Sequence, residues 1–332
     1  MCIRDSPSPD HSDPTMYCPA RKSESFKNLY EPIWDNGLNG TPVNEENYFA
    51  IYLYNLVQKY GAQTKYWEVI NEPDNDLGGN AAWGDDHPNN WWTNDPPPCE
   101  TKYGAPIQHY VRMLRIAYEV IKSLSPEDYI AVGGLGNASF LDAIMRNSDN
   151  PDGGEITAEF PNLGGAYFDC LSFHAYPHFD GTMRYWSDVF GGFQWERNSD
   201  GGVKGFFSRM DGMVDLMKEY GYGEGLDYPE KVLICTETNF TRKSLVDDFL
   251  GEEESQRNFV IKLLVEAQKR NVKQVHFYSL ADNLPASQAN SDFDFMGLFE
   301  NLENVPLRSE NMLATGVAFK SAATQLLSLI HI

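Results

Sequence analysis

The sequence has no long hydrophobic run and few positive charges. No stretch approaches the roughly 20 consecutive apolar residues that a membrane-spanning helix needs, so we expect no membrane span. Only 26 Lys and Arg residues stand against 48 Asp and Glu residues, and the net charge is -22. A surface this acidic repels nucleic-acid phosphates and anionic membrane surfaces, so we expect neither as a partner.

Cysteine is also scarce. The five residues are Cys2, Cys18, Cys99, Cys170 and Cys235, an odd number without Cys-x-x-Cys spacing. This pattern predicts neither a disulfide framework nor a metal site. Two of them lie inside apolar runs, where a free cysteine behaves as a small buried hydrophobe. No Gly-x-Gly-x-x-Gly turn opens a helix, so a dinucleotide-binding fold is unsupported and we expect no cofactor.

The two ends differ from the rest of the chain. Residues 1–14 and 327–332 show no periodicity that continues into their neighbours, and both resemble translated sequencing-adapter sequence. We therefore expect an artefactual leader (1–14), a single catalytic domain (15–326) and an artefactual tail (327–332). A natural signal peptide would have been lost with the true N-terminus, and we expect a secreted or periplasmic protein.

Between the ends, predicted helices and strands alternate. The strands are unbroken apolar runs, which are typical of a parallel sheet buried on both faces. Polar, aromatic loops follow the strands, as in a (β/α)8 TIM barrel, whose active site lies at the C-terminal strand ends. The sequence therefore predicts the α/β class and this barrel. The predicted helices are 45–60, 106–123, 139–146, 206–220, 253–269 and 311–326, and the predicted strands are 66–70, 129–132, 168–173, 231–236 and 272–278.

Aromatic residues are abundant in polar loops. They make up 13% of the chain, and many lie in the long loops 73–102 and 177–204 rather than in apolar runs. An aromatic ring packs well against the C–H face of a sugar, although rings can also simply cover a loop surface. Trp83 and Trp186 are our substrate-binding candidates from these two loops.

The first chemical motif is Asn71-Glu72-Pro73, at the end of predicted strand 66–70. Placed after an amphipathic helix and an apolar strand, it resembles the fourth strand of glycoside hydrolase clan A, including families 5 and 39. The resemblance implies that Glu72 is the acid/base and that Asn71 bonds to the sugar 2-hydroxyl. The simpler alternative is that Glu72 only caps the following turn.

Three further strand ends extend the resemblance. Glu237, after strand 231–236, resembles the nucleophile on the clan's seventh strand, and its position in the chain order fits. His174 and Tyr176, after strand 168–173, resemble the sixth strand, where the Tyr hydroxyl often bonds to the nucleophile. Many members carry a Trp on the eighth strand, where this chain has Tyr278, which we expect to take its place against the first sugar.

The resemblance implies a retaining hydrolase that cleaves an oligo- or polysaccharide through two carboxyls about 5 to 5.5 Å apart. We expect Glu72 and Glu237 to face each other at that separation. A non-catalytic carbohydrate-binding barrel remains the main alternative. A metal-dependent hydrolase is a third possibility, with candidate ligands His87, His109, His174, His178 and His276.

The numbering of the strands has a consequence for the barrel. If residues 66–70 are the fourth strand, only a stub of the third fits near residues 16–18, and the first two strands are missing. A barrel with strands four to eight cannot close, and its edge strands expose unpaired backbone groups. We therefore expect the chain made alone to be poorly soluble and inactive.

Overall fold

The computed structural model describes residues 2–3, 8–19, 21–196, 198–245, 252–303 and 311–329. The chain forms two compact units. The first comprises Met1–Phe173 and Met213–Val232, and the second comprises His174–Gly212 and Leu233–Ile332. Three elements run from one unit into the other: β4 (Cys170–Ala175), α4 (Ser199–Glu219) and β7 (Val232–Thr238).

The first unit contains a parallel sheet in the order β1 (Cys2–Ile3), β2 (Tyr66–Val69), β3 (Tyr129–Ala131) and β4. Glu68 of β2 is in register with Cys2 on one side and with Ala131 on the other. The side chains of β4 are all buried, as are most of those in β2 and β3. The predicted parallel, doubly buried strands are therefore confirmed in this unit.

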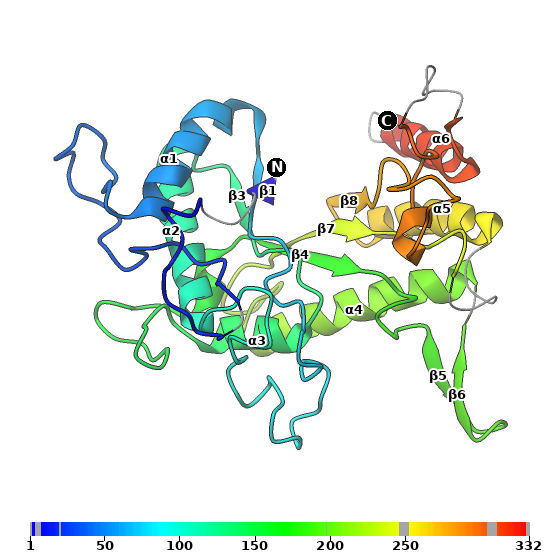
Figure 1. Cartoon of the computed structure of the whole chain (residues 1–332), viewed down its shortest axis with the longest axis horizontal. Coiled ribbons are helices and arrows are strands. Elements are labelled where there is room, and N and C mark those ends of the chain that lie inside the picture. Colours follow the sequence, from blue (N-terminus) through cyan, green and yellow to red (C-terminus); the bar gives the residue numbers. More distant parts are fainter. Residues whose placement is uncertain are drawn as a thin grey trace. The chain divides into compact units, whose positions relative to one another are not determined.

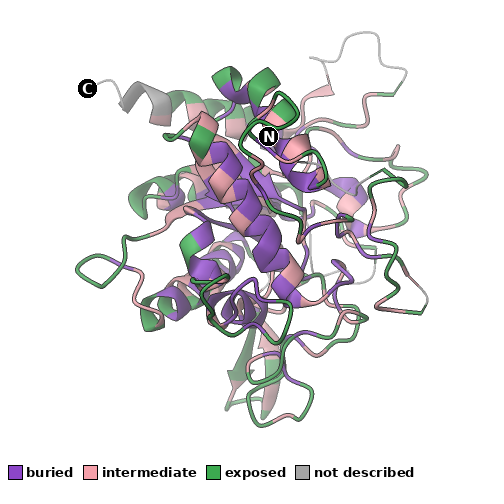
Figure 2. Ribbon diagram, turned by 90° about the vertical axis from the view of Figure 1, so that its left-hand side faces the viewer, coloured by how far each residue is buried: buried purple, intermediate pink, exposed green. Residues whose placement is uncertain are grey.

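Helices α1 (Tyr48–Tyr60), α2 (Ile107–Leu124) and α3 (Ala138–Arg146) accompany this sheet, and α1 packs along α2 (Figure 1). The side chain of Asn47 accepts a hydrogen bond from the Ala50 amide (3.1 Å) and so caps the start of α1. Much of these helices is buried, whereas the connecting loops mix buried and exposed residues (Figure 2). No helix in the described part of the chain is both long and apolar enough to cross a membrane.

The second unit pairs β7 in parallel with β8 (Gln274–Phe277), and α5 (Glu253–Lys269) packs against α6 (Ala314–Leu329). Among the residues that the structure describes, β8 pairs with β7 alone. Its side chains are half-buried or exposed, so the expectation of a strand buried on both faces is wrong for β8. With no described strand on its other side, β8 lies at the edge of the sheet, and its side chains stay partly open to solvent.

An antiparallel hairpin stands out in the second unit (Figure 1). It consists of β5 (Arg184–Ser187) and β6 (Gly192–Trp195), within the segment that the sequence predicts as an aromatic loop. Three short 3-10 helices complete the described elements: η1 (Gly61–Gln63), η2 (Gly164–Tyr167) and η3 (Asp292–Phe295).

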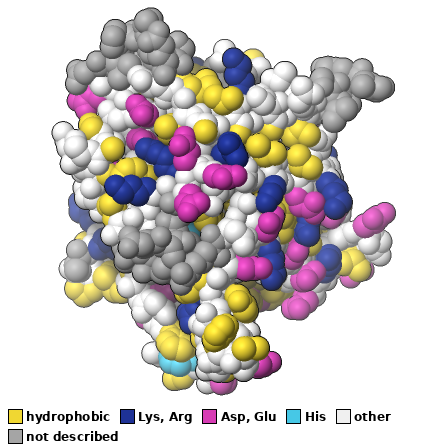
Figure 3. Space-filling view, turned by 90° about the vertical axis from the view of Figure 1, so that its right-hand side faces the viewer, with side chains coloured by type: hydrophobic (Ala, Val, Ile, Leu, Met, Phe, Trp, Pro, Cys, Tyr) yellow, Lys and Arg dark blue, Asp and Glu magenta, His cyan; other side chains and the backbone are white. Residues whose placement is uncertain are grey.

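Charges of both signs share the surface. On the face seen in Figure 3, Lys and Arg side chains lie among Asp and Glu side chains. In the second unit, Arg270 pairs with Asp211 (3.0 Å) and Lys262 pairs with Asp200 (2.7 Å). Exposed pairs of this kind each contribute only about 0 to 1 kcal/mol, so they reduce local repulsion more than they stabilise the fold.

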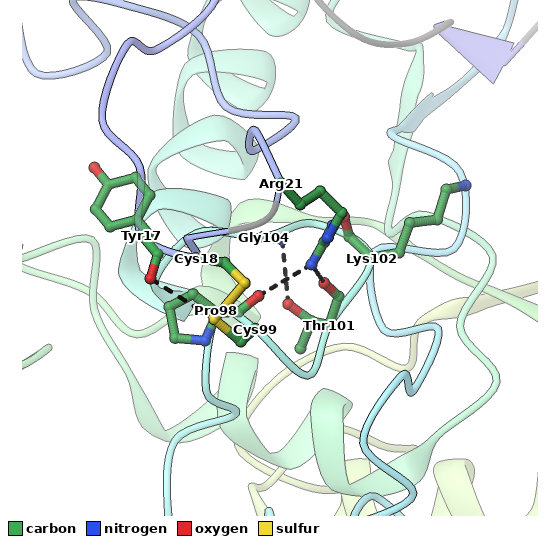
Figure 4. Close-up of a disulfide and its surroundings, with 8 residues drawn as sticks. All are labelled: Tyr17, Cys18, Arg21, Pro98, Cys99, Thr101, Lys102 and Gly104. Atoms are coloured by element: carbon green, nitrogen blue, oxygen red, sulfur yellow. Dashed lines mark hydrogen bonds between the residues drawn. A yellow bond between two sulfur atoms is a disulfide. The ribbon is translucent and has the colours of Figure 1, made fainter.

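The N-terminal region differs from the prediction in two ways. The strand beside β2 is Cys2–Ile3, within the predicted leader, whereas the expected stub near residues 16–18 is wrong because Cys18 forms an antiparallel bridge with Arg21. Cys18 also forms a disulfide with Cys99, which the cysteine spacing did not predict (Figure 4). At the other end, α6 continues to Leu329, beyond the predicted body. That residues 1–14 and 327–332 are foreign stays a prediction.

Candidate active site

The Asn-Glu-Pro turn (residues 70–73) follows β2 in the first unit. Its backbone is unusual because Ile70 and Glu72 have positive φ angles of 63° and 50°. Non-glycine residues rarely adopt this conformation, which persists only where the surroundings enforce it. Asn71 and Glu72 are both half-buried, so their side chains reach the surface of the unit.

Hydrogen bonds to the main chain hold this turn. The Glu72 amide donates to the Gly133 carbonyl (2.8 Å), and Lys102 Nζ donates to the Asn71 carbonyl (2.6 Å). Tyr110 links the end of β2 to the residues after β3. Its hydroxyl donates to the Val69 carbonyl (3.0 Å) and accepts from the Gly133 amide (2.9 Å). Burial raises the pKa of the Tyr110 hydroxyl well above its ordinary value, so it stays a donor.

Gly133 is required at this point of close approach. A Cβ atom there would lie 2.1 Å from the Ile70 carbonyl oxygen and 2.6 Å from that of Val69. The turn and the end of β3 therefore fit together only without a side chain at residue 133.

The loop that follows the turn is ordered by several side chains. Asp74 is buried and accepts from the Gly136 and Asn137 amides (2.8 and 2.7 Å), which fixes the loop to the start of α3. Trp83 is 49% exposed and stacks on His87 at 4.6 Å. Trp83 is thus available to a ligand, as predicted for a substrate-binding ring, and its role stays a prediction.

The Glu237 cluster, comprising His174, Tyr176, Thr236, Glu237 and Tyr278, lies in the second unit. Tyr176 donates its hydroxyl to Glu237 Oε2 (2.9 Å), and His174 Nδ1 lies 3.8 Å from the same oxygen. The other nitrogen of His174 lies 3.0 Å from Thr236 Oγ1. A hydroxyl donor stabilises the ionised form of a carboxylate and fixes its orientation.

An aromatic wall stands beside this carboxylate. Tyr176 packs edge-on against Tyr278 (6.2 Å between ring centroids) and against Phe293 (5.2 Å), which in turn stacks on Phe179. Asn283 Nδ2 donates to the Tyr278 hydroxyl (3.0 Å). Because Tyr278 is half-buried and Phe179 is 47% exposed, this wall offers ring surface close to Glu237.

The loop after β8 is tied to β7. Asn239 Nδ2 donates to the main-chain carbonyls of Tyr278 (2.8 Å) and Met296 (2.6 Å). Arg242 and Asp282 form a buried ion pair in the same region. These contacts fix the position of Tyr278 relative to Glu237.

Trp186 lies away from these contacts on β5. It is 56% exposed, packs edge-on against Phe193 (5.4 Å) and donates from Nε1 to Asp188 (3.1 Å). The structure therefore brings together His174, Tyr176, Glu237 and Tyr278, and it places Asn71 with Glu72 on their own turn.

The remaining histidines of the metal hypothesis lie in varied surroundings. His109 packs against Tyr17 and Tyr30, and exposed His276 lies 3.1 Å from Gln274 Oε1. His178 is buried between Phe179 and Phe240, and its two ring nitrogens have no hydrogen-bond partner among the residues that the structure describes. Burial lowers its pKa to about 3. Packing against rings accounts for His109 and His178 without a metal ion.

Several contributing residues were not predicted from the sequence. Lys102, Tyr110 and Gly133 hold the Asn-Glu-Pro turn, and Thr236 contacts His174. Glu68, which lies on β2 two residues before Ile70, is buried and accepts a hydrogen bond from Ser172 Oγ (2.5 Å). Only the position of Glu68 and Thr236 on predicted strands could have suggested them.

No protein-family model matches the chain, and no curated protein matches its sequence. Among solved structures, it is similar to an endo-laminarinase from Formosa Hel1_33_131 (15% identity, 81% of this chain and 65% of that chain, TM-score 0.47). It is also similar to a family 39 glycoside hydrolase from Bacteroides cellulosilyticus WH2 (16%, 86% and 47%, TM-score 0.45). A third is the family 17 β-1,3-glucanosyltransferase from Rhizomucor miehei (13%, 59% and 55%, TM-score 0.37).

The chain spans about half the length of the family 17 and family 39 structures. These solved neighbours are glycoside hydrolases and a related transferase, at low sequence identity. Because TM-scores below 0.5 describe a loose likeness, we argue the function from the side chains of this chain.

Proposed function

We propose that this chain is the catalytic part of a retaining glycoside hydrolase acting on an oligo- or polysaccharide, in an incomplete (β/α)8 barrel. Glu237 is the nucleophile and Glu72 is the acid/base. The observation that carries the proposal is the hydrogen bond from Tyr176 to Glu237 (2.9 Å), at the end of a parallel strand beside an aromatic wall. The hydrogen bond orients the carboxylate, and the aromatic wall supplies a surface for a sugar ring.

In the first step, a carboxylate oxygen of Glu237 attacks the anomeric carbon, and the bond to the leaving oxygen breaks. Glu72 gives its proton to that oxygen, so the leaving group departs as a neutral alcohol. Tyr176 keeps the attacking carboxylate in one orientation, and His174 lies beside it. The product of this step is a glycosyl ester on Glu237.

In the second step, Glu72 is ionised and takes a proton from water. The water oxygen attacks the anomeric carbon, the ester bond breaks, and Glu237 is released as a carboxylate. Asn71 bonds to the sugar 2-hydroxyl, and Tyr278 lies against the first sugar. Trp83 and Trp186 would contact sugars further along the chain.

The test compares variants by kcat/KM, which reports the first step. It uses this chain or, where the chain alone has no turnover, a longer active enzyme containing it. Glu237→Gln should abolish turnover of all substrates. Glu72→Gln should retain kcat/KM for dinitrophenyl glycosides, because their first step needs no protonation. Tyr176→Phe should lower kcat/KM about 10- to 100-fold on all substrates, because it removes one hydrogen bond to a charged group.

The control is Glu266→Gln on α5, which should keep full activity. An equal loss on both substrate types in Glu72→Gln would contradict its role as acid. Glycan binding without hydrolysis in every form would instead favour a non-catalytic carbohydrate-binding barrel. Loss of activity with a chelator would favour the metal-dependent alternative.

A further inference from the structure

The peptide groups of the Asn-Glu-Pro turn are held individually. Besides the Val69 carbonyl, which bonds to Tyr110, the carbonyls of Glu72 and Pro73 accept from the Asn75 amide (3.2 Å) and the Tyr103 amide (3.0 Å). The Asn71 carbonyl accepts from the side chain of Lys102 (2.6 Å). The Lys102 contact differs from the others because its donor carries a full charge.

Lys102 itself is fixed on the protein. Its amide donates to the Asn75 carbonyl (3.0 Å), and its own carbonyl accepts from Arg21 Nη1. Arg21 also donates to the carbonyls of Pro98 and Thr101, and the Cys18–Cys99 disulfide lies next to this clamp (Figure 4). The base of the lysine side chain is therefore anchored by contacts that do not involve the turn.

An acidic side chain lies near Lys102. Lys102 is half-buried, and Glu24 lies close enough for the two charges to interact. Burial raises the pKa of Glu24, whereas Lys102 and Arg21 act to lower it. A hydrogen bond from an ammonium group is roughly twice as strong as one between neutral groups.

We propose that Lys102 is a positioning residue for the acid/base, holding the Asn71 peptide so that Glu72 meets the leaving oxygen. This inference rests on the proposed function. Ile70 and Glu72 both have positive φ angles, and they lie on either side of Asn71, whose carbonyl Lys102 holds. Without the ammonium, this strained conformation loses a stabilising hydrogen bond, so it is less populated and Glu72 spends less time in place.

The kinetic test separates positioning from general damage. Lys102→Met should lower kcat/KM about 10- to 100-fold for unactivated glycosides, which need a proton from Glu72. Its kcat/KM for dinitrophenyl glycosides should stay within about 3-fold of the parent enzyme, because these leave without protonation. Lys102→Arg should recover much of the loss, since a guanidinium can also donate to the Asn71 carbonyl.

A second measurement needs no turnover. Amide hydrogen exchange at Glu72 and Asn75 should become about 10-fold faster or more in Lys102→Met. The Glu72 amide bonds to the Gly133 carbonyl and the Asn75 amide to the Glu72 carbonyl, and both bonds depend on the conformation of the held turn. The matched control is Lys122→Met, which removes a similar bond to the Asp128 carbonyl (2.6 Å) elsewhere in the first unit. That variant should leave exchange at Glu72 and Asn75 unchanged.

The outcomes distinguish the two claims. Unchanged exchange at both amides in Lys102→Met overturns the inference, as does an equal loss of kcat/KM on both substrate types. If Glu72→Gln itself shows no dependence on the leaving group, the proposed function fails instead, and faster exchange would then describe only the stability of the turn.

Discussion

At the scale of single residues, His178 is the clearest case in which burial sets a measurable property. Its imidazole is buried among rings, neither nitrogen has a hydrogen-bond partner in the described part of the chain, and burial lowers its pKa from 6.5 to about 3. The folded protein therefore keeps His178 neutral at pH values where the unfolded chain binds a proton.

This residue predicts how stability depends on pH. Above pH 6.5 the imidazole is neutral in both states and contributes no pH dependence. As the pH falls from 6.5 towards 3, the free energy of unfolding should decrease by up to about 1.4 kcal/mol per pH unit from this residue. His178→Leu removes the titrating group, so its urea midpoint should fall less between pH 7 and pH 4.5. Identical changes in parent and variant would show that His178 is not buried as a neutral group.

The sequence predicted some residues of the site better than others. Glu72, His174, Tyr176 and Glu237 were chosen because their strand ends resemble those of glycoside hydrolase clan A, and their roles stay predictions. Lys102 and Tyr110 were missed because their partners are distant in the sequence. Lys102 contacts Asn71, 31 residues away, and Tyr110 contacts Val69, 41 residues away. A local pattern carries no information on which distant side chain completes a hydrogen bond to the main chain.

At the scale of elements, the six helices and five strands predicted between residues 45 and 326 are present, whereas the stub expected near residues 16–18 is wrong. Their boundaries differ by up to seven residues, at the start of α4. The β5–β6 hairpin was missed because its segment is short, aromatic and polar, and we interpreted it as a loop. In the structure, Tyr185 pairs with Gln194 and Trp186 pairs with Phe193. Two short aromatic segments on either side of a short turn were therefore the signal that the sequence offered. Strand β1 was missed because it lies in residues 1–14, which we had set aside as an artefactual leader.

The contact between β3 and the Asn-Glu-Pro turn can be tested with a pair of glycine variants. Gly133→Ala would place a Cβ 2.1 Å from the Ile70 carbonyl oxygen, so the backbone must shift. We expect it to lower the free energy of unfolding by about 1 to 3 kcal/mol, as overpacking does, and to reduce kcat/KM for unactivated glycosides.

The control for this prediction is Gly212→Ala in α4, where a Cβ meets nothing within 4 Å. That variant should gain about 0.5 to 1 kcal/mol, because alanine favours a helix over glycine. Denaturant unfolding measures both values. Equal stability of the two variants would contradict the close approach at Gly133.

At the scale of the whole molecule, the alternation of apolar strands with amphipathic helices was enough to predict a parallel α/β protein, because these periods follow directly from which faces are buried. Which position of an eight-stranded barrel each strand occupies stays a prediction. The disulfide was not predicted because cysteine spacing alone does not give connectivity.

The central claim is that Glu237 becomes covalently bound to the sugar during turnover. A panel of 2-deoxy-2-fluoro glycosides with dinitrophenyl leaving groups tests it directly, because the fluorine slows both steps and the leaving group restores the speed of the first. Peptide mass spectrometry should find the fluoroglycosyl group on the peptide that contains Glu237, and on no peptide of Glu237→Gln. An adduct on another residue, or turnover that inverts the anomeric configuration without any adduct, would contradict the account.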